Sequence, residues 1–443
     1  MSKIKYFSST HGNTPTLGNN WGNLTNLLDA LLVNGFNPST LTSLVKLGST
    51  VTATTSGTHT YHVGAILILA GSLQPEYNIE VEVLSTTTTT FTFSDAGLSW
   101  SDVPGTITTK IAPLGFEAAF TDGAHKRAYR STVVASSKPI LLVDAGAKGT
   151  NTAGTTYNST WAKWANVGIV QDMTDINTVV GSQAPFDPAY PTRNRDGGGL
   201  ADQYGWAKWY WATNDDSQSE NENYGPPAAG NRPWALVGDG RSFYLWLARG
   251  FGSSANAMAS YGFGECKSFK AADTKAVWLM ADSLATSAIT TFASMTVGTY
   301  GSFGAAGAGT PRGYNSAGAN GKWLLESFDG VTQGQGFTLL GMGGVTVSGG
   351  AGALLPTPNG PDYALWLHQP IYLREDTGHM RGVMPGLAHI PHAAPYPDRY
   401  RIPASASNGN KDWLVVRSNY STTYTQNPSG AQVAMQISGE WEY

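Results

Sequence analysis

The sequence predicts a mainly β protein of several domains, and three observations lead to this prediction. Charged residues make up only 13% of the 443-residue chain, about half the usual share, while 53 glycines exceed the average frequency of roughly 7%. In several short stretches, apolar and polar residues alternate at period two, as in half-buried strands. Turn-rich segments separate these stretches. We expect a short N-terminal α-helix, a small β-barrel-like module, and large β-sandwich-type domains with long loops.

A helix is predicted near the N-terminus. Apolar residues recur there at three- and four-residue spacing, which places them on one helical face: Trp21, Leu24, Leu27, Leu28, Leu31 and Leu32. Gly35 ends the pattern, and a second short helix is predicted over residues 39–47. Residues 1–48 are expected to attach the protein to a neighbour. The candidate contact residues are Trp21, Leu24 and Leu28.

The residues ahead of this helix, 1–19, are polar and lack a core pattern. They are either a frayed terminus or an arm that orders against a neighbouring subunit. The chain begins without a signal-peptide core, and its aliphatic runs fall far short of the ~20 residues of a membrane span. A net charge of −4 gives no general attraction to nucleic acid. We therefore expect synthesis in the cytoplasm, no membrane insertion and no nucleic-acid partner.

Residues 49–112 have the pattern of a complete small β-module. Ile79, Val81 and Val83 alternate with Glu80 and Glu82, so one set should face a core and the other water. Further strands are expected at 51–55, 66–69, 91–93 and 107–111. The module contains no obvious catalytic group of residues, which favours a spacer or docking role.

Residues 113–300 are predicted to form a central β-domain, with strands at 128–134, 139–144, 234–237, 242–248 and 276–280. Gly238-Asp-Gly-Arg241 lies between two of these strands, and an Asp-Gly pair in that position indicates a hairpin. A phosphate-binding loop would instead need a helix after it. Arg241 is a candidate for pairing with a carboxylate of another subunit. The long loops 181–199 and 212–232 are expected to be functional or disordered.

Residues 301–443 are predicted to form a glycine-rich insertion and a C-terminal β-domain, either separate from the central domain or continuous with it. Strands are expected at 323–325, 337–340, 364–367, 370–373 and 413–416. The glycine-dominated segment 298–360 holds little that can form a core, so we expect it to order only in an assembly.

Three groups of residues are candidates for metal or ligand binding. Two carry oxygen ligands suited to Ca²⁺, namely Asp172, Asp175 and Asn177, and then Asp215, Asp216, Glu220 and Glu222. Neither has EF-hand spacing, so turn capping is favoured and no cofactor is predicted. The third group either binds a metal or is structural, and consists of His379, His389, His392, Asp376 and Asp398.

Three closely spaced tryptophans either stack on sugars or belong to a strand core: Trp206, Trp209 and Trp211. The alternation of Trp209 and Trp211 favours the strand core. The sequence has no nucleophile elbow, and no pair of carboxylates can be assigned to glycoside hydrolysis. We therefore expect a protein that is not an enzyme.

The 50–111 module resembles a Thr-rich β-module that is frequent in tail and adhesin proteins of tailed bacteriophages. The matching residues are His59, Val63-Gly64, Pro75-Glu-Tyr77-Asn78 and Phe91-Thr-Phe93, while Ala65 stands where that module usually has an acidic residue. Four blocks around it look like blocks shared by phage and prophage virion proteins: Leu28–Phe36, Met173–Asn177, Arg232–Arg241 and Arg381–Leu387.

The resemblance implies a virion structural protein of the tail, neck or baseplate that contacts copies of itself and other virion proteins. Low charge and abundant aromatic residues suit a surface covered by neighbours. The alternative is a receptor-binding adhesin that recognises host surface glycans through loops on a β scaffold. A third hypothesis is a depolymerase of host polysaccharide. The expected location is the virion, after synthesis in the cytoplasm of a bacterial host.

Overall fold

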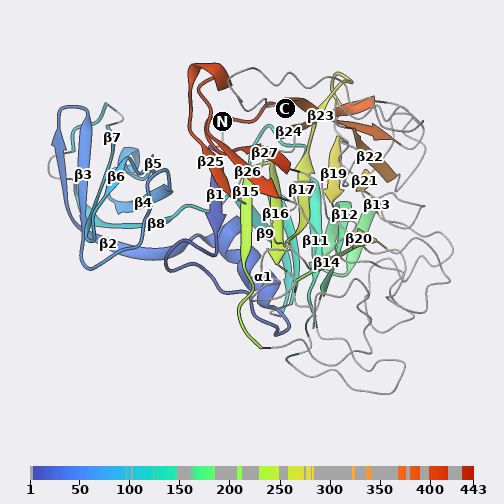
Figure 1. The fold of residues 1–443 in the computed structure, drawn as a ribbon. Helices are drawn as coiled ribbons and strands as arrows, with labels where there is room; N and C mark the ends of the chain where they lie inside the picture. Colours follow the sequence, from blue (N-terminus) through green and yellow to red (C-terminus); the bar gives the residue numbers. More distant parts are fainter. Residues whose placement is uncertain are drawn as a thin grey trace.

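The protein is mainly β, with the short α-helix α1 near its N-terminus, as the sequence predicts (Figure 1). The computed structural model describes residues 3–95, 97–100, 103–123, 125–146, 160, 162, 164–184, 207–211, 229–248, 258–273, 276–280, 282–283, 322–324, 336–340, 368–375, 380–389, 399–417 and 432–443. Two sheets and α1 form the body of the molecule, and a third sheet forms a module beside it. Within these ranges, no helix is long and apolar enough to cross a bilayer.

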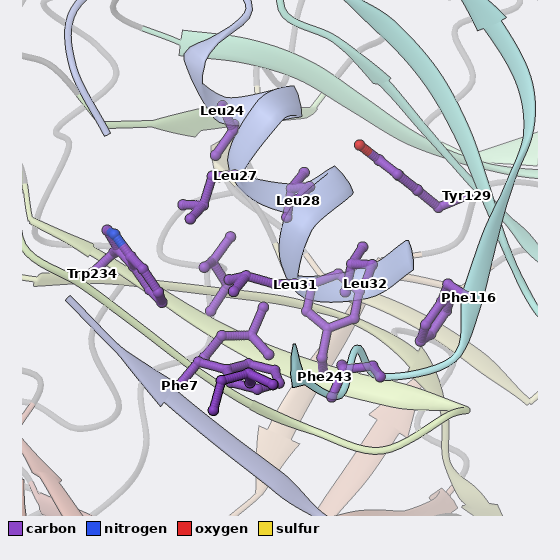
Figure 2. Packing of buried hydrophobic residues seen from close by; sticks show 14 of the residues in the cluster. Phe7, Leu24, Leu27, Leu28, Leu31, Leu32, Phe116, Tyr129, Trp234 and Phe243 are labelled. Atoms are coloured by element: carbon purple, nitrogen blue, oxygen red, sulfur yellow. The ribbon is translucent and has the colours of Figure 1, made fainter. Parts of the chain in front are cut away.

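The predicted N-terminal helix is confirmed. It begins as α1 (Asn23–Leu28) and continues as the π-helical turn η1 (Asp29–Asn34), which ends at Gly35 with a φ of 70°. Figure 2 shows its leucines in one buried cluster with Phe7 and Phe243, which belong to the thirteen-stranded sheet. Tyr129 closes the other side by donating a 2.7 Å hydrogen bond to Asp29 Oδ1. The helix is therefore a core element of the body.

The first sheet of the body has seven antiparallel strands in the order β20-β14-β12-β11-β10-β9, with β13 paired to β12. The strands are β9 (Phe116–Asp122), β10 (Lys126–Ser131), β11 (Ile140–Asp144), β12 (Trp164–Asp175), β13 (Thr178–Ala184), β14 (Ala207–Tyr210) and β20 (Asp282–Ser283). It packs face to face on the second sheet, where Phe116 and Trp209 make edge contacts with Phe243.

The second sheet has thirteen strands in the order β1-β15-β16-β17-β19-β21-β22-β23-β24-β27-β26-β25, with β18 paired to β24. The strands are β1 (Lys5–Ser8), β15 (Trp234–Gly238), β16 (Ser242–Ala248), β17 (Met258–Glu265), β18 (Lys267–Ser268), β19 (Val277–Met280), β21 (Lys322–Leu324), β22 (Gly336–Leu340), β23 (His368–Glu375), β24 (Met380–His389), β25 (Tyr400–Ile402), β26 (Trp413–Arg417) and β27 (Gln432–Gln436). Strands from both sides of residue 300 thus share one sheet.

This long sheet curls over, so that its late strands cover the outer face of its early ones. Tyr244 and Trp278 belong to one buried cluster with Met384 and Met435, and the Tyr244 hydroxyl donates a 2.8 Å hydrogen bond to the Pro385 carbonyl. Strand β16 is consequently buried on both faces along its whole length. Burial on both faces explains why its sequence is an almost unbroken apolar run.

The module is a seven-stranded sheet in the order β5-β4-β8-β2-β3-β7-β6. Its strands are β2 (Phe36–Leu47), β3 (Thr50–Thr55), β4 (Ile66–Ser72), β5 (Glu80–Glu82), β6 (Ser85–Thr86), β7 (Thr90–Ser94) and β8 (Gly105–Ile111). The strands at the two ends of this order, β5 and β6, are separated only by Val83 and Leu84. The Val83 N–H donates a 2.9 Å hydrogen bond to the Ala65 carbonyl next to β4, and the Leu84 N–H donates one of 2.8 Å to the Thr92 carbonyl on β7, so the two ends of the sheet meet. The predicted barrel-like module is confirmed.

The predicted second helix at 39–47 is wrong, because these residues belong to strand β2. Leu41 and Leu44 are three residues apart, a spacing that resembles a helical face. In the structure the pairing of β2 with β3 shifts register between Leu41 and Ser43. This β-bulge resets the alternation, so that both leucines pack against the core.

Both interpretations of the N-terminal residues 1–19 are also corrected for the described residues from 3 onward. Strand β1 pairs antiparallel with β15 of the same chain. Ile4 and Phe7 are buried, each in a different hydrophobic cluster of the body. Four residues are too few to establish strand periodicity in the sequence, and so β1 was not predicted.

Candidate functional site at the junction of module and body

A polar cleft of about 510 Å³ lies where the module meets the body. Three distant parts of the chain line it: β1 with the turn after it, the module around residues 62–64 and β5, and the C-terminal strands β25–β27. In Figure 1, β1 and β25 lie at the side of the body that faces the module. Its charged and aromatic lining residues are Tyr6, His11, His62, Glu82, Arg399, Arg401 and Asp412.

The module is fastened to the body beside this cleft. The Lys5 ammonium, 3% exposed, donates hydrogen bonds to Glu80 Oε1 at 2.6 Å and to the Pro113 carbonyl at 2.5 Å. Burial lowers the pKa of Lys5, although Glu80 opposes this shift. Gly12 lies so close to the module that a Cβ there would be 2.4 Å from the Cβ of Thr60. These contacts fix the two walls relative to each other.

One wall of the cleft is a stack of rings. Tyr6 meets His11 edge-on at 5.1 Å between ring centroids, and His11 lies 3.8 Å from His62. Burial, followed by the nearby His62 and Arg399, lowers the pKa of His11 to about 3. Burial and Arg401 also lower the pKa of His62. Both imidazoles are therefore neutral at pH 7.

The opposite wall carries two arginines on either side of Tyr400. Arg401 donates a 3.0 Å hydrogen bond to Asp412 Oδ2, and the Ala404 N–H donates to Asp412 Oδ1 at 2.9 Å. The Arg401 guanidinium reaches across to the module, since a Cβ on Gly64 would be 3.8 Å from it. Arg399 has a φ of 61°, in the left-handed region. Non-glycine residues there cost of order 1–3 kcal/mol and cluster at functional sites.

This arrangement is suited to binding. Guanidinium, carboxylate, imidazole and hydroxyl groups face one open space and together supply hydrogen-bond donors and acceptors. Over the described ranges, no group of three or more His, Cys, Asp or Glu side chains is placed to hold a metal ion. Recognition of a polar small molecule is the chemistry that these groups support.

A second polar cavity, of about 440 Å³, contains Arg241. Arg241 Nε donates to Glu265 Oε2, and its guanidinium lies 4.1 Å from the ring centroid of Tyr443. Glu265 Oε1 also accepts from the Ser136 hydroxyl at 3.1 Å and the Ser137 N–H at 2.5 Å. The predicted carboxylate partner of Arg241 thus belongs to the same chain and not to another subunit. The predicted hairpin around it is confirmed by the pairing of β15 with β16.

The candidate contact residues of the N-terminal helix lie inside the protein. Leu24 and Leu28 are fully buried, and Trp21 packs edge-on against Trp164 at 6.3 Å. Their partners are residues of the same chain. Placement in this core removes them from any outer surface of the protein in this structure.

Two of the three clustered tryptophans are core residues of the body. Trp209 donates a 2.9 Å hydrogen bond to the Met280 carbonyl, and Trp211 donates one of 2.9 Å to the Gly18 carbonyl. Both side chains are fully buried, as their alternation indicated, so neither is available to stack on a sugar. Trp206 lies outside the described residues.

The first Ca²⁺ candidate group serves local structure. Asp175 Oδ1 accepts from the Asn177 N–H at 2.8 Å and caps the turn between β12 and β13, while Asn177 Oδ1 accepts from Lys126 at 2.8 Å. Asp172 accepts from its neighbour Met173. The following candidates lie outside the described residues: Asp215, Asp216, Glu220, Glu222, His379, His392, Asp376 and Asp398. His389 ends β24, and its backbone alone is described.

Sequence reasoning missed the residues that form the cleft. The resemblance drew attention to His59, which is structural, since its Nδ1 accepts a 3.2 Å hydrogen bond from the Tyr61 N–H. The neighbouring His62 faces the cleft instead. The positive φ of Arg399 has no sequence signature, so only the fold reveals the site. No family model matches the chain, and a search of curated proteins finds no relative of it.

Proposed function

We propose that this chain is a structural component of a tailed-phage virion, assembled in several copies in the tail, neck or baseplate. The module resemblance supports this proposal, as does the architecture of a β-sandwich body with a small barrel-like module beside it (Figure 1). Its partners would be copies of itself and other virion proteins. We propose no catalytic activity for it.

The outer face of the module is the observation that carries the proposal. Neighbouring residues on β2, β3 and β7 form three rows without a charged side chain: Ser43-Thr54-Thr90, Val45-Thr52-Thr92 and Leu47-Thr50-Ser94. Val45 is 59% exposed and Leu47 84% exposed. Depletion of charge is typical of the centre of protein interfaces. An uncharged face rich in threonine suits contact with another virion protein.

The test is incorporation into particles. The double variant Val45→Lys/Leu47→Lys adds charge to this face without touching the core, so we expect wild-type thermal unfolding but loss of the chain from purified particles. Val134→Lys is the matched control, since Val134 is 94% exposed on the body. Quantitative mass spectrometry of particles measures the copy number. Wild-type incorporation of the double variant, or absence of the native chain from particles, would contradict the proposal.

The second candidate function is receptor binding to host surface glycans, which the polar cleft favours. Purified protein would then bind host cells and compete with phage adsorption. The double variant separates the two roles, because the outer face of the module does not line the cleft. It should still bind cells if the chain is an adhesin.

A further inference from the structure

We infer that the cleft between the module and the body binds an acidic saccharide, one or two sugar units that carry a carboxylate. Such a ligand would be the part of a host surface glycan that the chain recognises, so the inference rests on the second candidate function, receptor binding. It is separable from the structural role, because the cleft and the uncharged outer face of the module are formed by different residues.

The size of the cleft excludes a bare inorganic ion as the best-fitting ligand. Its volume of about 510 Å³ lies within the roughly 300–1,000 Å³ of small-molecule sites. One water molecule has a share of about 30 Å³ in the liquid, so a small ion would leave most of the space to solvent. A ligand of one or two rings matches the space better.

The lining favours a ligand with many hydroxyl groups. The guanidinium groups of Arg399 and Arg401 only donate hydrogen bonds, whereas the carboxylates of Glu82 and Asp412 only accept them. A sugar hydroxyl both donates and accepts, so it can satisfy either kind of partner. The rings of Tyr6, His11 and His62 add flat surfaces beside these groups. An apolar ligand would displace water from the charged groups without offering them hydrogen bonds in its place.

The two arginines favour a carboxylate on that ligand. A guanidinium matches a carboxylate with two parallel hydrogen bonds, which a lysine cannot reproduce. Asp412 holds the Arg401 side chain from one side, and that side chain remains 51% exposed at the cleft. The backbone of Arg399 is fixed in its left-handed conformation by a 2.8 Å hydrogen bond to the Val415 carbonyl. The Arg399 guanidinium donates a 3.4 Å hydrogen bond to the Ser8 hydroxyl, so both arginine side chains are held in place before a ligand arrives.

The same positive charges make the binding pH-dependent. His62 faces Tyr6 and His11 from β1, Glu82 from the module, and Arg399, Arg401 and Asp412 from the C-terminal strands. Burial and Arg401 hold the pKa of His62 below its usual value. A bound carboxylate offsets the charge of Arg401, so binding of the acidic saccharide and protonation of His62 favour each other electrostatically.

The experiment is calorimetric titration of the whole chain with a disaccharide that contains glucuronic acid, and with the matching disaccharide that contains glucose. We expect the wild type to bind the acidic disaccharide, and to bind the neutral one at least about tenfold more weakly. The affinity of Arg401→Gln for the acidic disaccharide should also be at least about tenfold lower than that of the wild type. Arg130→Gln is the matched control, because Arg130 pairs with Glu117 at 2.7 Å on β9 and β10, away from the cleft. Its affinity should equal that of the wild type.

The inference is overturned if the acidic disaccharide does not bind, if the neutral one binds equally well, or if Arg401→Gln and Arg130→Gln bind alike. Equal unfolding temperatures of Arg401→Gln and wild type show that the variant is folded. Incorporation of Arg401→Gln into particles is measured separately. Failure of sugar binding with normal incorporation refutes the saccharide site alone and leaves the structural role intact.

Discussion

At the scale of single residues, His11 and His62 make the contact between module and body sensitive to acid. Both have a lowered pKa in the fold, mainly through burial, and His11 titrates at about 3 against 6.5 for the unperturbed group. Below about pH 6.5 these two histidines are protonated in the unfolded chain but remain neutral in the folded protein, because their pKa values are lowered there. The free energy of unfolding is therefore unaffected by these histidines above about pH 6.5, and it decreases as the pH falls toward 3.

The variant His11→Phe tests this directly, because it keeps a ring between Tyr6 and His62 but cannot titrate. We expect the unfolding temperature of the wild type to fall more steeply between pH 6.5 and pH 4 than that of the variant. Thermal unfolding followed by circular dichroism at several pH values measures both slopes. Parallel slopes would show that His11 does not contribute to the acid sensitivity.

Single residues also mark the limit of what the sequence predicts about the site. The turn at Asp239 and Gly240 was predicted, because its signal is contained in neighbouring residues. His11, His62 and Arg399 meet only after three distant segments have folded, and each stands in an ordinary polar stretch. Local patterns carry no information about such a meeting.

At the scale of elements, variants of the N-terminal helix distinguish a role of its leucines in the core from a role in attachment to a neighbouring protein. Leu28 is fully buried between the two sheets of the body, so Leu28→Ala should lower the free energy of unfolding by about 2–5 kcal/mol. Leu47→Ala is the matched control on the exposed end of β2, with an expected change within about 0.5 kcal/mol. Urea unfolding measures both. Equal stability of the two variants would mean that the leucines do not form a core.

Strands with strong local patterns were predicted well, and elements that depend on pairing were not. The apolar run of β16 was placed correctly, because burial on both faces leaves a continuous signal. The sequence of strand β2 predicts a helix because a β-bulge changes the period of its apolar residues at Leu41. Strand β1 was missed because four residues show too little periodicity. In both failures the partner strand decides the structure.

At the scale of the whole molecule, the module and the body are closed in different ways. The module buries its sheet edges by joining β5 to β6 through two residues, whereas the body covers its strands with a sheet that curls over itself. The predicted domain ranges followed local composition, so the strand at Phe36 was assigned to the attachment segment. The domain boundaries are set by pairing between strands that are distant in the sequence, and local composition does not reveal that pairing.

The closed sheet of the module predicts that it folds when it is excised. Residues 36–112 contain every strand of that sheet and its buried core, including Val51, Phe91 and Phe93. The fragment lacks the Lys5–Glu80 ion pair and the contact of Phe7 with Phe36 at 5.8 Å. We expect a cooperative thermal transition at a lower temperature than that of the module in the whole chain, since a domain of this size is marginally stable.

Dispersed amide signals in a proton–nitrogen NMR spectrum, together with a single unfolding transition, would establish the fragment as folded. The variant Lys5→Met in the whole chain serves as the comparison, because it removes the same ion pair while the body remains attached. It should lower the unfolding temperature of the module toward that of the fragment. A fragment without dispersed signals would show that the body, and not closure of the sheet, supplies the decisive part of the module's stability.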